Sequence, residues 1–501
     1  MNYTSLCVLP LFLLPFTSTG QYGELDMSFG PTGYAITGQA MGNSAVNKLI
    51  HQADGDILVS TLGPISIQTD LLSSVAVADP EWYTYAHTAM AYPTGNIVER
   101  PDGKVVVAVM GLTAANDLRL LRYATNSELD PGFGTDGVVL HPFPDVDQVH
   151  VSAMELLPDG RMVLAGSVRD SSSERVLVGR FHEDGSLDPT FNGTGLLFLD
   201  VGDATVAEDL LLLPDGGILI GGYSMESGTK HMLLARLLAN GELDGSFGTD
   251  GMVDLDLGYS AQAIQGMALA PGGAIVAAGW VEQSETDTDA FLGMFSTMGQ
   301  LDPGFGTNGW LLVDVAAGLD RYNDVLLDRD DLILTCGEAW PAGMPQATIT
   351  RRTLSGTPDP TFGTDGTAMT EFEFGGSGTC LALQADGKVL LGGSWAGGLY
   401  TYGMVARFTA GTYSGIATRE AAAPLVVVPN PATELIQLTL PDPGHAFELR
   451  IHDAIGRIVG RGQLGTTRPS VVDVHGLAEG AYQLVLSDGP QVYRASFVIA
   501  R

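Results

Sequence analysis

Histidines and clustered acidic residues are the side chains of this 501-residue sequence that could carry acid–base or metal chemistry. The nine histidines are scattered, and no two have the His-x-x-x-His spacing that is typical of zinc ligands. Acidic residues gather in two short clusters, Asp287/Asp289 and Asp328/Asp330/Asp331. Such clusters could hold Ca²⁺ through oxygen atoms, but neither matches an EF-hand loop or a β-roll repeat. Solvated turns are the favoured interpretation, so we expect no cofactor, with Ca²⁺ as the alternative.

Other catalytic patterns are also missing from the sequence. It contains no Gly-x-Ser-x-Gly motif that would present a serine nucleophile. Glycine-rich turns are plentiful, but none stands between a strand and a helix, where a phosphate could be cradled. Because no catalytic constellation is visible, we predict that the protein is not an enzyme.

A nine-residue motif recurs along most of the chain, and its clearest copy is Leu129–Gly137, Leu-Asp-Pro-Gly-Phe-Gly-Thr-Asp-Gly. Its aspartates are Asp26, Asp130, Asp188, Asp244, Asp302 and Asp359. A catalytic site needs one asymmetric arrangement rather than several equal ones, so repetition argues against catalysis. We interpret these aspartates as turn caps at the joints between units. Asp bonds its own backbone two residues on, Gly supplies positive φ, and the Phe can tuck under a sheet.

The spacing of the motif predicts the architecture. From Asp130 to Asp359 the steps are 58, 56, 58 and 57 residues. The step from Asp26 to Asp130 is 104 residues, which leaves room for a degraded copy at Asp79–Trp82. In phase with the motif, Asp-Gly pairs separate apolar runs, and we assign them to type I′ hairpin turns. Seven four-stranded units of about 57 residues predict an all-β, seven-bladed β-propeller over residues 21–412, with an open β-solenoid as the alternative.

An unmatched copy of the motif predicts how the ring closes. In four units an arginine stands eight residues before the motif aspartate, as Arg180 does before Asp188. Arg407 in the last unit has no such aspartate after it, while Asp26 belongs to a copy without a unit of its own. We therefore predict that Asp26 lies beside Arg407 as Asp188 lies beside Arg180. The alternative is that these arginines only extend over the sheet face.

One feature differs between the units. After the apolar second strand, units four to seven each carry an aromatic residue: Tyr223, Trp280, Trp340 and Trp395. Equivalent strand ends lie on one rim of a propeller, so these rings could stack on sugar faces or anchor a protein partner. The alternative is that each ring covers the loop beside it.

Composition and chain ends indicate an exported protein. The formal net charge is −34, which disfavours nucleic acid and anionic lipid and suits cations, basic partners or, as we favour, solubility. Residues 1–20, with the apolar run Leu6–Phe16, predict a signal peptide, and no segment is predicted to span a membrane. Cys336 and Cys380 fall in neighbouring units, and we favour two buried thiols over a disulfide.

The repeat stops after Phe408. Residues 413–423 are small and Ala-rich, which predicts a linker. Residues 424–501 contain short strands separated by turn residues, and they predict a small C-terminal β-sandwich.

Three sequence blocks follow one another in this tail. They are Val428-Pro429-Asn430-Pro431, then Leu449–Asp453 with Gly456-Arg457, then Leu477–Tyr482. The tail resembles the C-terminal sorting domain of type IX secretion cargo, and the residues that carry the resemblance are Pro429, Asn430, Pro431, Gly456, Gly480 and Tyr482. The family's usual last strand carries Lys, whereas this chain ends in Phe497–Arg501. The resemblance implies a Bacteroidota-type envelope protein that engages the type IX machinery through 424–501 and is released or attached to the cell surface.

The repeated units resemble the delta-60 repeats through Leu-Asp-x-x-Phe-Gly-x-x-Gly, over about Glu24–Phe408. This resemblance implies a propeller-like repeat domain without a defined activity.

Two classes of function stay open. The first is a secreted or cell-surface, non-catalytic propeller that binds a glycan or a surface protein, and it predicts no buried histidine or carboxylate cluster at the central channel. The second is a secreted polysaccharide-degrading enzyme, with paired carboxylates about 5–10 Å apart in a pocket at the channel mouth. The sequence favours the first class, because no unit concentrates catalytic residue types.

Overall fold

β-Strands make up nearly all of the regular structure in the computed structural model. The described residues are 22–30, 32–37, 43–52, 55–63, 67–73, 78–86, 96–110, 116–316, 318–370, 372–397, 400–410, 426–428, 432–433, 435–439, 447–453, 458–464, 470–478, 480–487 and 492–500. Within these ranges, helix is confined to two 3-10 turns, Pro271–Gly273 and Pro341–Gly343. The predicted signal peptide and linker lie outside the described residues.

One four-stranded unit shows how the sequence folds locally. It consists of β14 (Ala204–Leu212), β15 (Ile218–Glu226), β16 (Thr229–Leu237) and β17 (Met252–Leu255), which pair in order as an antiparallel meander. The first five residues of β15 are all buried. A continuous apolar run of this kind is typical of a strand that is covered on both faces.

The Asp-Gly turn between β14 and β15 is not the type I′ turn that we predicted. Among its residues Pro214, Asp215 and Gly216, only Gly216 has a positive φ, at +85°. The N–H of Gly216 donates to the carbonyl of Leu213 at 2.9 Å. A three-residue loop that ends in a left-handed residue needs positive φ at one position only, so the aspartate keeps an ordinary conformation.

The other propeller strands repeat this meander. Blade 1 contains β2 (Ala45–His51), β3 (Ile57–Leu62), β4 (Ile67–Leu72) and β5 (Ala78–Ala86), and blade 2 contains β6 (Asn96–Glu99), β7 (Val105–Met110), β8 (Asp117–Tyr123) and β9 (Val138–Pro142). Blade 3 contains β10 (Gln148–Leu156), β11 (Met162–Arg169), β12 (Glu174–Phe181) and β13 (Leu196–Leu199), and blade 4 is β14–β17. One residue pair, Glu174 with Ala204, joins blades 3 and 4 into a single sheet.

The remaining strands complete the series. Blade 5 contains β18 (Gln262–Leu269), β19 (Ile275–Ser284), β20 (Asp287–Phe295) and β21 (Trp310–Val313), and blade 6 contains β22 (Arg321–Leu327), β23 (Ile333–Ala339), β24 (Gln346–Arg352) and β25 (Thr367–Met369). Blade 7 combines β26 (Gly376–Leu383), β27 (Val389–Ala396) and β28 (Thr401–Phe408) with β1 (Tyr34–Thr37) from the start of the chain. The predicted all-β propeller is confirmed, and the grouping of the described strands is consistent with seven blades.

The degraded motif copy that we placed at Asp79–Trp82 is not a turn. These residues lie inside β5, the outer strand of blade 1. The sequence Trp82-Tyr-Thr-Tyr85 is rich in aromatic and β-branched residues, which favour strands. An outer strand also tolerates Pro80, because one side of an edge strand needs no hydrogen bonds.

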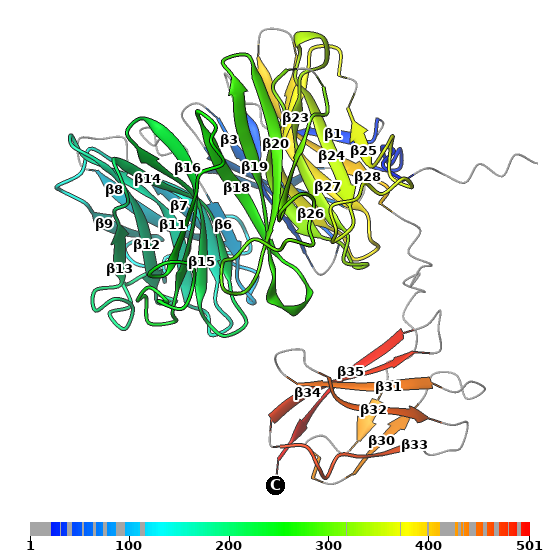
Figure 1. Cartoon of the computed structure of the whole chain (residues 1–501). Helices are drawn as coiled ribbons and strands as arrows, with labels where there is room; N and C mark the ends of the chain where they lie inside the picture. Colours follow the sequence, from blue (N-terminus) through cyan, green and yellow to red (C-terminus); the bar gives the residue numbers. More distant parts are fainter. Residues whose placement is uncertain are drawn as a thin grey trace, which may run out of the picture.

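The blades close into a ring. The inner strand of each blade contacts the neighbouring blade, from β6 with β10 through to β22 with β26, and β2 of blade 1 contacts both β26 and β27 of blade 7. Figure 1 shows the blue N-terminal strands beside the yellow strands of the last sheet. A closed ring buries both faces of every blade, whereas the open solenoid would leave the two end blades half-exposed.

The predicted closure pair is confirmed. Arg407 Nε donates to Asp26 Oδ2 at 2.8 Å, as Arg180 Nε donates to Asp188 Oδ2 at 2.7 Å. Lys388 Nζ lies 2.9 Å from the same oxygen of Asp26. Partial burial opposes ionisation of Asp26, but the Ser28 hydroxyl and the two cations hold its pKa well below the usual value.

The N-terminal segment also completes the turn that follows the third strand of blade 7. In blade 4 this turn is closed by the N–H of Leu238, which donates to the carbonyl of Glu242. In blade 7 the N–H of Thr409 makes the equivalent bond, to the carbonyl of Glu24 at 3.0 Å. Tyr22 accepts the N–H of Gly363 from blade 6, as Met298 of blade 5 accepts the N–H of Gly248. The ring is therefore closed by a hairpin whose two halves come from opposite ends of the propeller.

The phenylalanines of the repeated motif pack each blade against the next one. Each is fully buried: Phe29, Phe133, Phe191, Phe247, Phe305 and Phe362. The ring of Phe191 packs on Gly241 of the following blade, where a Cβ atom would come within 2.8 Å of the ring and where φ is +86°. The guanidinium of Arg180 covers Phe191 at 4.9 Å, so one arginine neutralises Asp188 and shields the phenylalanine.

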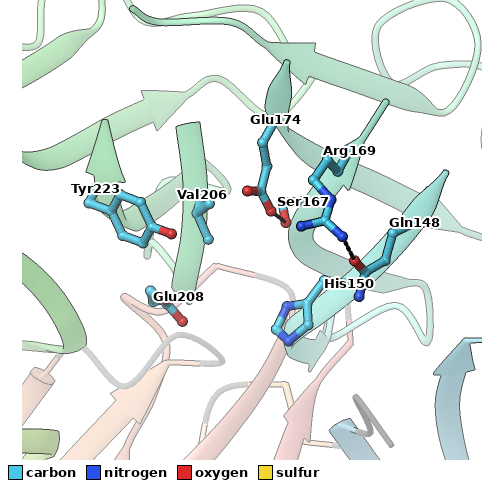
Figure 2. A pocket seen from close by; sticks show the side chains of 8 residues that line it. All are labelled: Gln148, His150, Ser167, Arg169, Glu174, Val206, Glu208 and Tyr223. Atoms are coloured by element: carbon cyan, nitrogen blue, oxygen red, sulfur yellow. Dashed lines mark hydrogen bonds between the residues drawn. The ribbon is translucent and has the colours of Figure 1, made fainter. Parts of the chain in front are cut away.

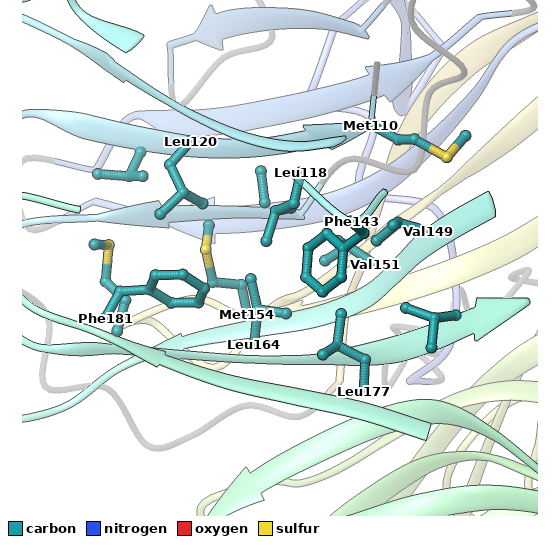
Figure 3. Packing of buried hydrophobic residues seen from close by; sticks show 14 of the residues in the cluster. Met110, Leu118, Leu120, Phe143, Val149, Val151, Met154, Leu164, Leu177 and Phe181 are labelled. Carbon is teal, nitrogen blue, oxygen red and sulfur yellow. The ribbon is translucent and has the colours of Figure 1, made fainter. Parts of the chain in front are cut away.

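Apolar side chains fill the space between neighbouring blades. Between blades 2 and 3, Leu118 and Leu120 pack with Met154, Leu164 and other buried residues into one cluster (Figure 3). A blade alone could not bury these faces, which is why the repeat needs neighbours.

The tail is a separate two-sheet unit, as predicted. One sheet contains β29 (Val426–Val428), β30 (Leu435–Thr439) and β33 (Ser470–Asp473), and the other contains β31 (Phe447–Asp453), β32 (Ile458–Leu464), β34 (Gly480–Ser487) and β35 (Val492–Ile499). Ile436 from the first sheet and Leu484 from the second share one core. The sequence reasoning did not identify β32, whose two glycines interrupt its apolar pattern.

Replacement of Asp26 by Ala tests the closure. The variant leaves Arg407, which is 4% exposed, without its carboxylate, and an uncompensated buried charge costs about 3–5 kcal/mol. We expect the lower end of that range, because Asp26 is partly exposed. Asp302→Ala is the matched control, since Met294 stands at the arginine position of that repeat. Equal losses of unfolding free energy in urea for the two variants would contradict the closure role.

Candidate functional site

β-Bulges on the inner strands turn polar side chains toward the propeller axis. In β14, Ala207 pairs with Gly222 and Asp209 pairs with Gly221, so Glu208 is the extra residue of a bulge. Register shifts at the same place in five other inner strands leave Asn47, Ser152, Gln265, Asn323 and Thr379 as the extra residues. All six are polar, which is unusual for an inner strand and marks this level of the ring as hydrophilic.

Several bulge side chains bond the next blade. Ser152 Oγ donates to the carbonyl of Ala207 at 2.7 Å, and Asn323 Nδ2 donates to the carbonyl of Gly378 at 2.7 Å. Thr379 Oγ1 donates to the carbonyl of Val46 and so spans the closure between blades 7 and 1. These bonds satisfy carbonyl groups that the bulges leave without a strand partner.

Four charged side chains meet at the axis. Lys48 of blade 1 pairs with Glu155 of blade 3 at 3.2 Å and is also attracted to Asp209 of blade 4 and Asp324 of blade 6. Because these residues come from blades around the whole ring, they can converge only at its centre. Carboxylates therefore cluster at the channel, which the non-catalytic class of function was predicted not to show.

The axial carboxylates are bonded into the framework. Asp209 Oδ2 accepts the N–H of Met267, and Asp324 Oδ2 accepts the N–H of Leu381, each at 2.7 Å and each from the following blade. Burial, with repulsion from Asp324, raises the pKa of Asp209 to about 7, and burial raises the pKa of Asp324 to about 6. We assign these groups to the joints between blades, since both carboxylates are already engaged by backbone donors.

A pocket of about 270 Å³ lies between blades 3 and 4, where their inner strands begin (Figure 2). Its lining residues are Gln148, His150, Ser167, Arg169, Glu174, Val206, Glu208 and Tyr223. In Figure 2, Tyr223, Val206 and Glu208 of blade 4 form one wall, and the side chains of blade 3 form the other. All but Val206 are polar, whereas ligand pockets are usually lined mainly by apolar groups. This pocket is the candidate functional site.

The pocket contains ionisable groups whose pKa values are shifted in different directions. Burial lowers the pKa of His150, although the charge of Glu174 opposes this. Burial raises the pKa of Glu208 to about 7 and that of Tyr223 to about 12. At neutral pH the pocket therefore offers a neutral imidazole, a neutral phenol and a carboxyl group close to half-protonated.

Two hydrogen bonds hold the wall from blade 3. Ser167 Oγ donates to Glu174 Oε1 at 2.9 Å, and Arg169 donates from its guanidinium to Gln148 Oε1 at 2.6 Å (Figure 2). His150 Nδ1 lies 3.1 Å from Ser152 Oγ, which fixes the ring. The side chains that line the pocket are thus positioned by the strands before any ligand arrives.

Sequence reasoning found only Tyr223 among these residues. It missed His150 and Glu208 because they are far apart in the sequence, and neither belongs to a known motif. A signal was nevertheless present. Each bulge residue stands seven positions before the turn residue equivalent to Asp215, so a polar residue at that fixed distance marks an inner-strand bulge.

The four rim aromatics are not equivalent. Tyr223 pairs with Val206 and Trp280 pairs with Ala263, and these are matching positions in blades 4 and 5. In blade 7, Trp395 lies one residue beyond the matching position, which Ser394 occupies, and it packs against Tyr402. The prediction of one aromatic rim is therefore wrong for Trp395.

Trp340 also departs from the predicted position. Blade 6 has Glu338 at the place of Tyr223, so Trp340 lies two residues further on, just after β23. Counting from the glycines misled the sequence prediction, because blade 6 has Cys336-Gly337 where blade 4 has Gly221-Gly222. Only Tyr223 and Trp280 share one rim position.

The acidic clusters singled out in the sequence differ in their surroundings. Asp328 Oδ1 accepts the N–H groups of Asp330 and Leu332, so this carboxylate caps a turn. Asp289 accepts the side-chain amide of Gln283 at 2.6 Å. Elsewhere in the described residues, one group with metal-ligand spacing is formed by Glu226, His231 and Asp254, at the rim of blade 4.

Each motif aspartate caps its own turn. Its Oδ1 atom accepts the N–H two residues on, as from Asp188 to Thr190 at 3.0 Å and from Asp302 to Gly304 at 2.9 Å. The same bond forms at Asp26, Asp130, Asp244 and Asp359. Cys336 and Cys380 are buried free thiols, as predicted.

The fold and the motif geometry define an all-β repeat protein of the propeller class. Residues 100–133, 157–191 and 213–247 match the beta-propeller described as a domain of unknown function (DUF5122), and residues 426–500 match the secretion system C-terminal sorting domain. The chain thus contains DUF5122 propeller repeats followed by a type IX sorting tail. Such a tail indicates export to the cell surface or beyond and an interaction with the secretion machinery.

Solved structures of similar backbone include a virginiamycin B lyase from Staphylococcus aureus, with 9% identity over 74% of this chain and 98% of that one and a TM-score of 0.45. A protein of unknown function from Dyadobacter fermentans shares 12% identity over 76% and 98%, with a TM-score of 0.41. Polysaccharide lyase Uly1 shares 11% identity over 78% and 98%, with a TM-score of 0.42. No curated protein matches the chain.

Within the tail, two of the sorting-motif residues are described. Tyr482 is 9% exposed, its hydroxyl donates to the carbonyl of Ala478 at 2.8 Å, and its ring stacks on Phe497. Gly480 begins β34. The residues Pro429, Asn430, Pro431 and Gly456 lie outside the described residues. Among the described residues, no helix has the length and apolarity needed to cross a membrane.

Replacement of Asp209 by Asn tests the axial cluster. The folded-state pKa of Asp209, about 7, lies above its ordinary value of 3.8. Its contribution to stability is therefore fully present below about pH 4 and is lost as the pH rises to about 7. We expect the Asn variant to lose less unfolding free energy over this range than the wild type. Identical pH profiles, measured by urea unfolding, would contradict the raised pKa; Asp215→Asn, in an exposed turn, is the control.

Proposed function

We propose that this protein is an exported, non-catalytic propeller that binds a hydroxyl-rich ligand, a saccharide, in the pocket between blades 3 and 4. The observation that carries the proposal is the polar lining of this pocket. His150, Ser167 and Tyr223 supply donors and acceptors at fixed positions, and a saccharide satisfies such groups with its hydroxyls. The sorting tail supports export of the protein, which would then be released or attached to the cell surface. In either place it would encounter extracellular glycans.

The asymmetry of the ring also supports a single binding site. The motif residues repeat from blade to blade and are occupied in turns and joints. In contrast, the bulge residue is Glu208 in blade 4, Ser152 in blade 3 and Thr379 in blade 7. Among the described residues, the set of polar groups that lines the pocket lies between blades 3 and 4.

A second candidate is a polysaccharide-degrading enzyme at the same pocket. His150 is suited to accept a proton because burial keeps it neutral, and Glu208 is suited to donate one because burial raises its pKa to about 7. A base and an acid of this kind, held on opposite walls, are what general acid–base catalysis requires. Glu174 and Glu208 also provide two carboxyl groups in one pocket.

Variants of the pocket test the binding proposal. We expect Tyr223→Phe and His150→Ala to weaken saccharide binding about tenfold each, because a lost hydrogen bond in a polar pocket costs about 1–2 kcal/mol. Tyr123→Phe, at the end of β8 and outside the pocket, should leave binding unchanged. The measurement is calorimetric titration of the propeller-bearing chain with the strongest ligand from a glycan array. An array without any bound saccharide would reject the proposal.

The enzymatic candidate makes a different prediction. If the protein depolymerises a polysaccharide, its rate should rise with pH as His150 becomes neutral and fall above about pH 7 as Glu208 ionises. Glu208→Gln should abolish the rate, while Glu226→Gln, outside the pocket, should not. Product release from an array of polysaccharides, followed by reducing-end and 235-nm absorbance assays, checks this. Binding without product formation at any pH would leave the non-catalytic role.

A further inference from the structure

Most cations of the propeller are neutralised within the fold. Twelve lysines and arginines among its described residues have a carboxylate within 4.0 Å. This is expected in a chain of net charge −34, where acidic partners are abundant. A cation without such a partner is therefore informative.

Three cations at one rim have no carboxylate within 4.0 Å among the described residues: Arg169, Lys230 and Arg321. They belong to blades 3, 4 and 6 and stand where inner strands begin or where second and third strands meet. This rim is also the rim of the pocket, and Arg169 lines the pocket itself. Three cations without a carboxylate partner thus lie beside the candidate site, whereas Arg352, which also lacks one in the described residues, is buried and donates to the carbonyl of Gly356.

Aromatic rings hold two of these cations without neutralising them. Lys230 Nζ lies 4.0 Å from the centre of the Tyr223 ring and 6.0 Å from that of Trp280. Arg321 Cζ lies 4.7 Å from the centre of the Trp280 ring. A ring face attracts a cation through its quadrupole but carries no net charge, so the charge remains available to an anion.

This arrangement changes the role of the rim aromatics. The Tyr223 ring carries Lys230 and the Trp280 ring carries Arg321, so these faces are engaged by cations rather than left open for sugar stacking. Tyr223, Lys230, Trp280 and Arg321 instead form an alternating row of rings and cations that runs from the pocket over blades 4 to 6. We call these four residues the cationic row.

Burial disfavours the charged form of two acidic groups near the row. It raises the pKa of Glu208 to about 7 and also raises the pKa of Glu338, the cross-strand partner of Arg321. Glu174 lies across the strand pair from Arg169, outside the row, and accepts a hydrogen bond from the Ser167 hydroxyl. The row thus places Lys230 and Arg321 near carboxyl groups whose charge burial disfavours, in a chain of net charge −34.

We propose that the cationic row, together with Arg169, binds the anionic groups of an acidic saccharide chain whose sugar ring occupies the pocket. This inference rests on the proposed saccharide site and adds the charge of its ligand. Successive cations along the rim suit a polymer with repeated carboxylate or sulfate groups better than a single charged sugar. Guanidinium and ammonium donors bind both kinds of anion.

The experiment compares charged and neutral forms of the same chains. Oligomers of polygalacturonate and their methyl esters provide the carboxylate arm, and a sulfated galactan and its desulfated form provide the sulfate arm. We expect the acidic form of at least one pair to bind about tenfold or more tightly than its neutral form at low salt, with the advantage lost at high salt. The arm that shows the difference identifies the anionic group.

Variants test whether the cationic row causes the preference for the acidic chain. Lys230→Gln and Arg321→Gln, separately and combined, should remove the preference for the acidic chain while leaving the neutral chain unaffected. Arg329→Gln is the matched control, since it removes one positive charge in the β22–β23 turn at the opposite rim. Thermal unfolding of each variant checks folding, and the salt dependence of the unmodified protein gives a readout that needs no variant.

The two proposals fail in distinguishable ways. If neutral and acidic chains bind equally and the affinity is insensitive to Lys230→Gln and Arg321→Gln, the cationic row is rejected and the saccharide site stands. If no chain of either kind binds, or binding persists unchanged in His150→Ala, the pocket itself is rejected. An equal loss in Arg329→Gln would show a general charge effect and overturn the inference.

Discussion

The ring depends on the contact by which each blade covers the face of the next one. A four-stranded sheet cannot bury both faces alone, so every joint must form and the last joint must be made by the two ends of the chain. In the closure joint, Arg407 binds Asp26 at 2.8 Å and covers Phe29 at 4.6 Å. The same three residue types serve the internal joints, as in Arg180, Asp188 and Phe191. The N-terminal segment thus supplies the motif turn and the fourth strand of the last blade.

Closure also shapes the axis. Bulges in six inner strands place polar residues at one level of the ring and leave carbonyl groups without strand partners. Ser152, Asn323 and Thr379 satisfy some of these carbonyls across blade boundaries. Asp209 and Asp324 do the same for backbone N–H groups. The polar centre is therefore part of the framework, although a carboxylate cluster there resembles a catalytic site when only residue types are considered.

We seek function where the copies differ, and the proposed site lies on the rim of blades 3 to 6. The bulge and strand ends there place His150, Glu208 and Tyr223 around one pocket. Beside them, Lys230 and Arg321 are held on aromatic faces in a chain whose other cations are mostly neutralised. Polar walls and unpaired positive charge are complementary to an acidic, hydroxyl-rich ligand, which is consistent with export by the sorting tail.

The sequence by itself determined the repeat, the strand-rich fold, the closure pair Asp26–Arg407 and the sorting tail. These features depend on local turn chemistry and on spacing along the chain, which a single sequence displays directly. Only the tertiary structure decided the site. Glu208 and His150 lie 58 residues apart in the sequence, and one-residue bulges decide which side chains face the axis. A shift of one or two residues likewise took Trp395 and Trp340 out of the rim position that Tyr223 and Trp280 share. Residue counting does not detect such shifts, because strand register is set by pairing with neighbouring strands.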